Sequence, residues 1–479
     1  MVRVKVTLVN PSPNIGLDER ESRKAVASFP PLGILYLVSA LKEKGFEVSV
    51  LDQPAKGFTI EETVNWICKE DPDMLGFSTF ATSGRTAALI SREIKKRNPN
   101  IVVVFGNHYA TFNAERVLTK YPSVDVIVRG EGELIIIDLV NYITGKGNLK
   151  EIDGISFRNK NKIVSTPDRP LIKDLDSIPF PDRSSVDKNY HCIMAGANVA
   201  PKKFTSILSS RGCLYRCRFC SCSQFARGRW RPRSIQNTID ELNLIASEGY
   251  EQFIFIDDSF TLNQKRVIKL CRKMRKEKLD MEWVCEGRVD NCSIEMLYEL
   301  RKAGCKVLYF GIESANQRVL DYLNKQTTPV QSRRAVKKAR KAGIDILVGS
   351  FVMGAPDEKR KEIHNTIKFA SQIPIDIPQF NILGVYPGTD LWDEMWKKGY
   401  LKGEDYWETG IAISQFYPGT VPFHEIRQMI HDAFYKFIRR PSFIFKQMAR
   451  TLKSPYRMEI AINNVSRIDD IRTNLSSVA

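Results

Sequence analysis

The stretch TSILSSRGCLYRCRFCSC, residues 205–222, joins a predicted buried strand to four closely spaced cysteines. Its first six residues are apolar at the centre and bounded by small polar residues, which is typical of a strand in a parallel sheet. Cys213, Cys217 and Cys220 follow in a C-x3-C-x2-C pattern, and Cys222 comes two residues later. Because barrels of βα units place chemistry at the carboxyl ends of their strands, this loop is a candidate site.

Five further strand-like segments follow this loop and alternate with helical patterns. They are QFIFIDD, MEWVCEG, VLYFGIES, ILVGSFVMG and QFNILGVYPG, all within residues 252–388. Strands that alternate with helices favour a parallel sheet, since each helical crossover returns the chain to the same edge. Residues 203–400 are therefore predicted to form a partial (β/α)6 barrel of the TIM type.

The first part of the chain shows the same alternation. Its strand-like segments VKVTLVN, FEVSVLD, MLGFSTF, IVVVFG and VDVIVRG are separated by amphipathic stretches such as LGILYLVSALKEKG. They predict an α/β domain with a parallel sheet covered on both faces, over residues 1–145. Ligands of such sheets bind outside the carboxyl ends of the strands. Residues 146–202 are predicted as a linker, and residues 401–479 as a small, basic, helical C-terminal region.

The composition is that of a folded, basic protein. The chain has 479 residues, of which 43% are hydrophobic, and 72 basic against 55 acidic residues give a net charge of +17. This charge favours a polyanionic or anionic-surface partner, although a well-solvated basic surface explains it equally. With no signal peptide and no apolar run of roughly 18 residues, a cytoplasmic location is predicted. Six scattered cysteines are predicted as reduced thiols in cores: Cys68, Cys192, Cys271, Cys285, Cys292 and Cys305.

The clustered cysteines predict an iron–sulfur site. Three thiolates on one short loop can hold three irons of a cubane cluster and leave the fourth iron open to another ligand. A zinc site would need a second cysteine or histidine pair, and none follows at a suitable spacing. Cys222 is so close to Cys220 that we expect it to point away as a bystander. A fully ligated cluster, in an electron carrier or sensor that is not an enzyme, remains an alternative.

The C-x3-C-x2-C pattern, with the aromatic Phe219 before its last cysteine, resembles the radical S-adenosylmethionine (radical SAM) superfamily. The resemblance implies that Cys213, Cys217 and Cys220 are catalytic and hold a [4Fe–4S] cluster whose open iron is chelated by SAM. The reduced cluster would split SAM into a 5′-deoxyadenosyl radical. An external electron donor of the ferredoxin or flavodoxin type is implied as well.

The later strand ends agree with this resemblance. Each carries polar residues at a position where the superfamily contacts SAM, and GSFVMGAP resembles its glycine-containing motif on the adenine side. Taken singly, each acidic residue would be a helix cap or a solvated loop residue, but their recurrence at successive strand ends favours a site. The SAM-binding candidates are Asp257 or Asp258, Glu286, Arg288, Glu313 and Ser314.

The first domain is similar to the cobalamin-binding domain fused to a large class of radical SAM enzymes. The similarity lies in FPPLGILYLVSALKEKGFEVSVLD, MLGFSTFATS, VVVFGNHYATF and VIVRGEGE. It implies a Rossmann-like fold and a corrinoid across the strand ends, with its nucleotide tail near the hydroxyls of Ser78, Thr79 and Thr82. With the radical SAM region, the resemblance covers nearly the whole chain up to about residue 400.

Two departures from that pattern concern the cobalt. The Asp-x-His-x-x-Gly motif that supplies an axial histidine in other cobalamin proteins is absent. Where the family often has Gly-Gly-Pro-His, this chain has Gly106-Asn107-His108. His108 is therefore either a loop histidine hydrogen-bonded to backbone or cofactor, or a cobalt ligand. A vestigial domain without a corrinoid remains an alternative.

The C-terminal region is basic and aromatic and supports three interpretations. It could be a capping helix with core aromatics, an interfacial helix at an anionic membrane, or a nucleic-acid binder. The residues concerned are Phe434, Tyr435, Lys436, Phe437, Arg439, Arg440, Phe443, Phe445, Lys446, Arg450, Lys453 and Arg457.

The sequence thus predicts a cobalamin-dependent radical SAM enzyme that functionalises an unactivated C–H bond. Methyl transfer to a hydrophobic small molecule, either a lipid or a tetrapyrrole-like compound, is the favoured reaction. Oxidative cyclisation or C–C bond formation without methyl transfer is the alternative. The predicted location is cytoplasmic, with peripheral association at the inner membrane face through the basic region as a variant, and nucleic acid is the least favoured partner.

Overall fold

A computed structural model describes residues 4–13, 29–160, 162–186, 190–194, 196–401 and 418–464. The chain divides into two compact units. The first comprises Met1–Lys188, Gln224–Ala226 and Tyr386–Gln415, and the second comprises Asn189–Ser223, Arg227–Val385 and Phe416–Ala479. The predicted C-terminal region extends over residues 402–417 and 465–479, which lie outside the described residues.

The first unit contains a seven-stranded sheet in the order β2-β1-β3-β4-β5-β6-β7. Its first five strands are parallel, because each is linked to the next through a helix, and β6 and β7 add to one edge in antiparallel fashion. Residues 146–202, expected as a linker, therefore contain two strands of this sheet. The strands are β1 (Lys5–Asn10), β2 (Glu47–Asp52), β3 (Met74–Ser78), β4 (Val102–Gly106), β5 (Val126–Val128), β6 (Ile155–Asn159) and β7 (Lys162–Ser165).

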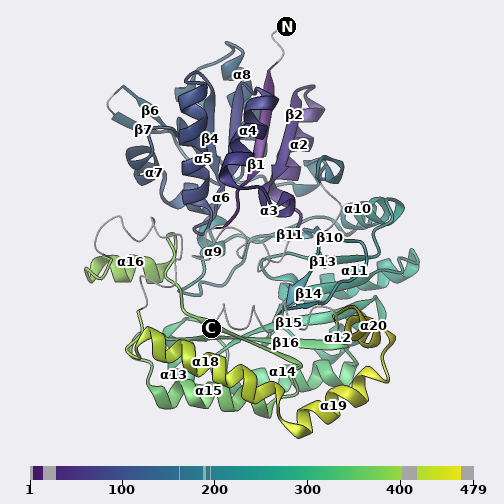
Figure 1. Ribbon diagram of the computed structural model, residues 1–479. Helices are drawn as coiled ribbons and strands as arrows, with labels where there is room; N and C mark the ends of the chain where they lie inside the picture. The colour runs from purple at the N-terminus through teal and green to yellow at the C-terminus, as the bar shows by residue number, and fades with distance from the viewer. Residues whose placement is uncertain are drawn as a thin grey trace. The chain divides into compact units, whose positions relative to one another are not determined.

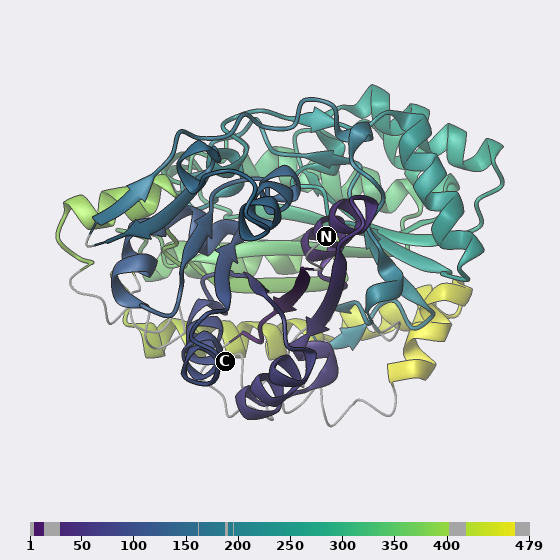
Figure 2. The same ribbon diagram turned by 90° about the horizontal axis from the view of Figure 1, so that it is seen from above.

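Helices cover both faces of this sheet, as the sequence predicts (Figures 1 and 2). One apolar core lies between the sheet and α2 (Leu32–Glu43) with α8 (Glu133–Ile143). The other lies under α4 (Ile60–Glu70), α5 (Gly84–Arg97), α6 (Asn107–Phe112) and α7 (Ala114–Lys120). Shorter helices of this unit are α3 (Gln53–Lys56) and α16 (Asp390–Lys397).

The second unit contains a six-stranded, all-parallel sheet in the order β10-β13-β14-β15-β16-β17. This confirms the predicted six strand–helix units of a partial barrel. The strands are β10 (Phe204–Ile207), β13 (Gln252–Phe255), β14 (Glu282–Arg288), β15 (Cys305–Glu313), β16 (Ile346–Met353) and β17 (Ile377–Ile382). Two short antiparallel pairs accompany it, β8 (Ile193–Met194) with β9 (Ala197–Asn198) and β11 (Ser210–Arg211) with β12 (Arg231–Pro232).

One apolar core fills the space between this sheet and the helices on its outer face. Side chains alternate along each strand, so residues such as Cys285, Phe310 and Phe351 enter this core and their neighbours Glu286 and Ser350 face the other way. The inner face thus carries polar side chains among apolar ones such as Val284 and Val348. The helices are α10 (Ile235–Ser247), α11 (Gln264–Lys276), α12 (Ile294–Lys302), α13 (Gln317–Tyr322), α14 (Pro329–Ala342) and α15 (Arg360–Gln372).

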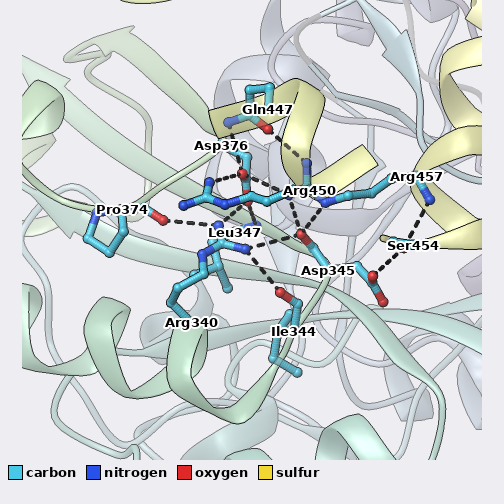
Figure 3. A network of polar contacts seen from close by, with 10 residues as sticks. All are labelled: Arg340, Ile344, Asp345, Leu347, Pro374, Asp376, Gln447, Arg450, Ser454 and Arg457. Carbon is cyan, nitrogen blue, oxygen red and sulfur yellow. Dashed lines mark hydrogen bonds and ion pairs between the residues drawn. The ribbon is translucent and has the colours of Figure 1, made fainter. Parts of the chain in front are cut away.

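The C-terminal part is helical, as predicted. It forms α18 (Phe423–Ile438), α19 (Pro441–Thr451) and α20 (Pro455–Asn464), the yellow-green to yellow helices of Figure 1. Phe437 is buried in the main core. Arg450 and Arg457 bind the buried Asp376 (Figure 3), and Arg440 donates to the carbonyl of Ser371. These three arginines are therefore occupied within the protein.

All ten cysteines are free thiols. Five of the six scattered ones are buried, in agreement with the sequence, but Cys68 is exposed, so its predicted place in a core is wrong. Cys68 lies on the outer side of α4, where its neighbours in the sequence are charged. In the part of the chain that the structure describes, no helix is long and apolar enough to span a membrane.

Candidate functional site

The cysteine loop begins directly after β10 and is fastened to the end of β13. Asp257 accepts hydrogen bonds from the backbone N–H and the hydroxyl of Ser209, both at 2.7 Å, and from the hydroxyl of Ser210. The neighbouring Asp258 accepts one from the backbone N–H of Gly212 at 2.8 Å. Gly212 has φ = +89°, a conformation that suits glycine, and it turns the chain into the cysteines.

The two aspartates thus differ in their environment. The carboxylate of Asp257 is buried, and burial raises its pKa although three donors surround it. Its oxygens are occupied by the loop, whereas Asp258 is exposed and accepts a hydrogen bond from the backbone N–H of Gly212. We infer that Asp257 positions the loop and that Asp258 is the better candidate for a ligand contact.

Residues from the end of β14 hold the middle of the cysteine loop. Nη1 of Arg288 lies 3.9 Å from Sγ of Cys217, and the guanidinium lies 3.5 Å from the centroid of the Tyr215 ring. Asp290 fixes this guanidinium through two hydrogen bonds of 3.0 Å. Asn291 donates to the Tyr215 hydroxyl at 2.9 Å. Arg288 therefore places a fixed positive charge beside one of the cysteine thiols.

The segment after α13 holds the same loop from another direction. Asn324 donates through Nδ2 to the carbonyl of Arg216 at 2.7 Å, and the backbone N–H of Arg218 donates to the carbonyl of Leu323 at 3.0 Å. The guanidinium of Arg218 lies 4.7 Å from the centroid of the Tyr322 ring. The loop conformation is therefore built by protein contacts alone, which is the preorganisation that a cofactor site requires.

The four clustered thiols are not equivalent. Burial raises the pKa values of Cys213 and Cys217, in the latter case against the lowering effect of Lys325 and Arg288. A hydrogen bond with Cys222 lowers the pKa of Cys220 to about 7. Because this hydrogen bond joins the two thiols, the prediction that Cys222 points away from Cys220 is wrong. The short helix α9 (Cys222–Phe225) begins at this residue.

These residues fit a cubane cluster better than a single ion. Among the described residues, no three Cys, His, Asp or Glu side chains are placed to hold one metal ion. A cubane presents a separate iron to each thiolate, so its ligands need not converge on one point. Cys213, Cys217 and Cys220 are half-buried on a fixed loop, and nearby positive charges can offset the charge of thiolates and sulfides. Phe219 lies half-buried in the same loop.

A buried ion pair that the sequence did not reveal stands next to Cys217. Nζ of Lys325 lies 2.7 Å from Oε1 of Glu313, and both side chains are less than a tenth exposed. Burial alone would lower the pKa of Lys325, but Glu313 and Cys217 raise it on balance. A Cβ atom on Gly311 would lie 2.7 Å from Oε1 of Glu313 and 2.8 Å from Nζ of Lys325. Any larger residue at Gly311 would therefore displace this pair from its present position.

Glu313 itself adopts a strained backbone. Its φ is +63°, and the pairing register of β15 shifts between Gly311 and Glu313. A non-glycine residue in this region costs of order 1–3 kcal/mol, and such strain concentrates at functional sites. The bulge re-aims the Glu313 side chain toward Lys325 and away from the regular pleat. Lys325 lies beyond α13 with no strand pattern around it, so only its position in space identifies it.

The inner face of the sheet carries further polar groups. Burial of the Glu286 carboxyl raises its pKa, and the negative charges of Glu313 and Asp258 raise it further. Tyr309 hydrogen-bonds with Ser350, and Asn381 donates to the Ser350 hydroxyl at 3.1 Å. These residues come from β14, β15, β16 and β17 in turn. They form a polar row across the inner face, of which the sequence singled out only Glu286.

Two other predicted features have local structural partners. Ser314 is buried, accepts from the backbone of Asn316 at 3.1 Å and lies 3.2 Å from the hydroxyl of Thr366, so its hydroxyl shapes the chain after β15. In the loop after β16, Glu358 accepts from the backbone N–H groups of Gly354 and Ala355 at 2.6 and 3.1 Å. Burial raises the pKa of Glu358 to about 7.

The candidate residues of the first unit lie at the ends of β3 and β4. Thr79 is fully buried, and its hydroxyl donates to the Gly106 carbonyl at 2.8 Å, so it joins the two strand ends. Ser78 accepts from Nδ2 of Asn107 at 2.9 Å, and Thr82 is half-buried in the turn that follows. Ser78 and Thr82 are thus better placed than Thr79 to meet a ligand.

His108 stands in the first turn of α6. Oδ1 of Asn107 lies 2.8 Å from its Nδ1, which assigns the proton to Nδ1 and leaves the lone pair on Nε2. The ring stacks on Phe225 with centroids 4.2 Å apart and an interplanar angle of 16°, and on Phe80 at 6.1 Å. All three residues belong to the first unit. The tautomer suits a metal ligand or a hydrogen-bond acceptor, and the stacked rings suit a flat apolar partner.

Comparison with protein families gives two matches. The model of the radical SAM superfamily matches residues 207–370. The model of the B12 binding domain matches residues 23–140. The first match contains the cysteine loop and the strands β13, β14, β15 and β16. The second match contains Ser78, Thr82 and His108.

Individual proteins are similar over most of the chain. A protein of Pyrococcus horikoshii described as an uncharacterized methyltransferase is 36% identical over 423 residues, which cover 88% of this chain and 90% of the relative. The anaerobic magnesium-protoporphyrin IX monomethyl ester cyclase of Rubrivivax gelatinosus is 30% identical over 406 residues, covering 82% and 70%. The solved structure of the cobalamin-dependent S-adenosylmethionine radical enzyme OxsB, with aqua-cobalamin and S-adenosylmethionine bound, has a TM-score of 0.71 over 99% of this chain and 75% of that chain. At 19% identity this last likeness concerns the fold.

Proposed function

Because this chain belongs to the family of B12-binding radical SAM enzymes, we propose that it transfers a methyl group to an unactivated carbon of a hydrophobic small molecule. The observation that carries the proposal is the preformed loop with Cys213, Cys217 and Cys220. The 36% identity to a protein described as a methyltransferase, over 90% of its length, supports methyl transfer as the reaction.

The residues divide the work among three cofactors, a [4Fe–4S] cluster, SAM and cobalamin. When bound, these cofactors supply an electron, a carbon-centred radical and a methyl group, and the protein holds and orients them. Cys213, Cys217 and Cys220 would hold three irons. Arg288 and Lys325, which lie beside Cys217, offset negative charge there and tune the potential of a cluster.

The acidic residues around the loop would orient SAM. Asp257 is engaged by the loop and Glu313 by Lys325, so Asp258 and Glu286 are the more accessible carboxylates. A carboxylate is the natural partner of the SAM ammonium group. Glu313 is held in place by Lys325, so it presents its second oxygen in a fixed direction. Asp257 and Ser314 act behind these groups, as positioning residues.

The cobalamin residues lie in the first unit. Ser78 and Thr82 offer hydroxyls at the strand ends, and the stacked rings of Phe80 and His108 offer a flat apolar surface. The hydrogen bond from Nδ1 to Asn107 orients His108 and fixes its tautomer. The function of this residue is therefore to present Nε2 in a defined direction.

Cyclisation is the second candidate, because the chain is 30% identical to a magnesium-protoporphyrin cyclase over 70% of that relative. Both reactions begin with hydrogen abstraction from carbon, so the same residues serve either one. A tetrapyrrole is a substrate class that both candidates share.

The test is anaerobic turnover with SAM labelled in its methyl group. Reconstituted, reduced protein is incubated with metal-bound porphyrins and with polycyclic lipids, and the products are weighed by mass spectrometry. Methyl transfer predicts a product that carries the labelled methyl group, and cyclisation predicts an unlabelled product that has lost hydrogen. Cys217→Ala is the inactive control. A protein with a full cluster that converts none of these substrates would contradict the proposed substrate class.

A further inference from the structure

Helix α19 turns its apolar residues away from the protein. Ile444, Phe445, Met448 and Leu452 are 46%, 74%, 61% and 76% exposed. Phe445, Met448 and Leu452 are spaced three and four residues apart, and Ile444 lies four residues before Met448, so all four lie on one side of the helix and its C-terminal end. None of the residues of α19 is buried. Scattered exposed apolar residues are ordinary, but an aligned row of four on one helix is not.

Apart from Phe443, which packs against Phe437 and the main core, the side of α19 that faces the protein is polar. Gln447 and Arg450 donate to Oδ1 of the buried Asp376 at 3.0 and 2.9 Å (Figure 3). A helix that packs on a water-soluble core normally shows the reverse pattern, with apolar residues inward and charged residues outward. The helix is thus amphipathic in the opposite sense, which is expected of a helix whose outer face meets an apolar phase.

A network of ion pairs fixes this orientation. Asp376 also binds Arg340 of α14 and Arg457 of α20, and it accepts from the backbone N–H of Leu347 at 2.8 Å. Arg457 in turn binds the carbonyl of Asp345 and Oε1 of Gln447. Rotating α19 to bury Phe445 would remove Gln447 and Arg450 from Asp376. The exposed face is therefore a built feature of the fold.

The charges near this face select an anionic partner. Lys446 and Lys453 flank the apolar row, and Lys436 and Arg439 are exposed on the preceding turns of α18. These last two help to line a shallow hollow of about 580 Å³ with His431, Tyr435, Arg440 and the acidic Asp432. Exposed lysines beside an apolar row have long stems that let the ammonium group reach lipid phosphates while the row is inserted.

We propose that α19 is a membrane-docking helix that lies in the interface of an anionic lipid bilayer. Ile444, Phe445, Met448 and Leu452 enter the acyl boundary, and Lys446 and Lys453 contact the phosphates. The helix attaches the enzyme to the surface where apolar compounds dissolve. This inference concerns binding alone, so it can fail or hold independently of the proposed reaction.

The test is sedimentation of the full chain with vesicles. Vesicles of phosphatidylcholine alone are compared with vesicles of equal parts phosphatidylcholine and phosphatidylglycerol. We expect the wild type to bind the anionic vesicles at least tenfold more tightly than the neutral ones, since each surface lysine contributes to attraction by an anionic leaflet. The double variant Phe445→Ser, Leu452→Ser should weaken binding by at least tenfold, because two buried apolar side chains are lost.

Two matched variants distinguish binding through this face of α19 from nonspecific adsorption to vesicles. Val330→Ser removes an apolar side chain that is 57% exposed on α14 and should leave binding unchanged. Lys446→Glu with Lys453→Glu should abolish the preference for phosphatidylglycerol. The thermal midpoints of all variants should match the wild type, since the altered side chains are exposed.

Three outcomes would overturn the proposal. The first is equal binding to neutral and anionic vesicles, and the second is binding that the Phe445→Ser, Leu452→Ser variant retains. The third is a wild-type dimer in light scattering that the same variant converts to a monomer, because a second copy of the chain would then cover this face.

Discussion

Lys325 and Glu313 form a pair whose two members depend on each other. Lys325→Met leaves the Glu313 carboxylate buried without its partner, which typically costs 3–5 kcal/mol. We expect the free energy of unfolding in urea to fall by about that amount. The double variant Lys325→Met, Glu313→Gln removes both charges and should recover most of the loss. A double variant as unstable as the single one would show that the pair does not act as a unit.

The clustered cysteines give a second prediction at this scale. Cys217→Ala should reduce the iron bound after anaerobic reconstitution and remove the charge-transfer absorbance of the cluster, because it removes a proposed ligand. Cys222→Ser is the matched control on the same loop and should keep both signals. Loss of iron in the Cys222 variant together with retention in the Cys217 variant would reverse the ligand assignment.

Sequence predicted which loop carries the chemistry but not how its residues divide their roles. The spacing of the cysteines and the acidic strand ends are visible in one dimension. Other contacts depend on how distant segments pack. Examples are the hydrogen bonds of Asp257 with Ser209 and Ser210 and that of Lys325 with Glu313. The hydrogen bond between Cys222 and Cys220 was likewise not evident from the spacing of the cysteines.

At the scale of elements, Asp376 joins α14, α19 and α20 to the beginning of β16. Asp376→Ala leaves three arginines without their shared partner, so we expect a loss of about 3–5 kcal/mol in the free energy of unfolding. Hydrogen exchange in α19 and α20 should rise most, since these helices have little apolar contact with the core. Uniform exchange across the second unit would contradict a local role.

The same carboxylate gives the protein a pH dependence. Burial would raise the pKa of Asp376, but Arg340 and Arg457 lower it on balance. A lowered pKa in the folded state contributes stability above the unfolded value near 3.9, and this stability is lost as the pH falls through the folded value. The difference in urea midpoint between wild type and Asp376→Asn should therefore be largest at neutral pH and shrink below about pH 4. A constant difference would exclude this linkage.

Glu358, in the loop after β16, is predicted to change the stability with pH in the opposite direction. Burial raises the pKa of Glu358 to about 7, so the folded state holds a proton that the unfolded state releases near pH 4.3. Stability from this group is present below about pH 4 and is lost as the pH rises to about 7, with a size on the order of 1–3 kcal/mol. Glu358→Gln retains an oxygen for Gly354 and should flatten this part of the urea profile. An unchanged slope would place the titration elsewhere.

Element periodicity predicted most of the fold, because strands and helices alternate with clear periods in both units. It could not predict that β6 and β7 extend the first sheet. Both strands are short, and they are joined by a turn without a clear alternation of apolar and polar residues. The C-terminal helices were predicted as helical, basic and aromatic. Which side of α19 faces inward depends on Asp376, far away in the sequence, so the direction of its apolar face emerges only from the fold.

On the scale of the whole molecule, each unit presents its own set of ligand-binding groups at the ends of parallel strands. The second unit offers three half-buried thiols with fixed cations beside one of them, and the first offers hydroxyls and an oriented histidine. Composition indicated a basic, folded chain and no more. The family and its cofactors were predictable because short motifs carry them, whereas the substrate depends on the detailed shape of the inner face.

The proposal that the cysteine loop holds a cluster that cleaves SAM is tested most directly by measuring 5′-deoxyadenosine formed by the reduced, reconstituted protein. We predict that the wild type and the Cys222→Ser variant form this product and that the Cys217→Ala variant does not. Failure of a wild-type protein with a full complement of iron, supplied with substrate, to form 5′-deoxyadenosine would contradict the claim, and so would undiminished formation by the Cys217→Ala variant.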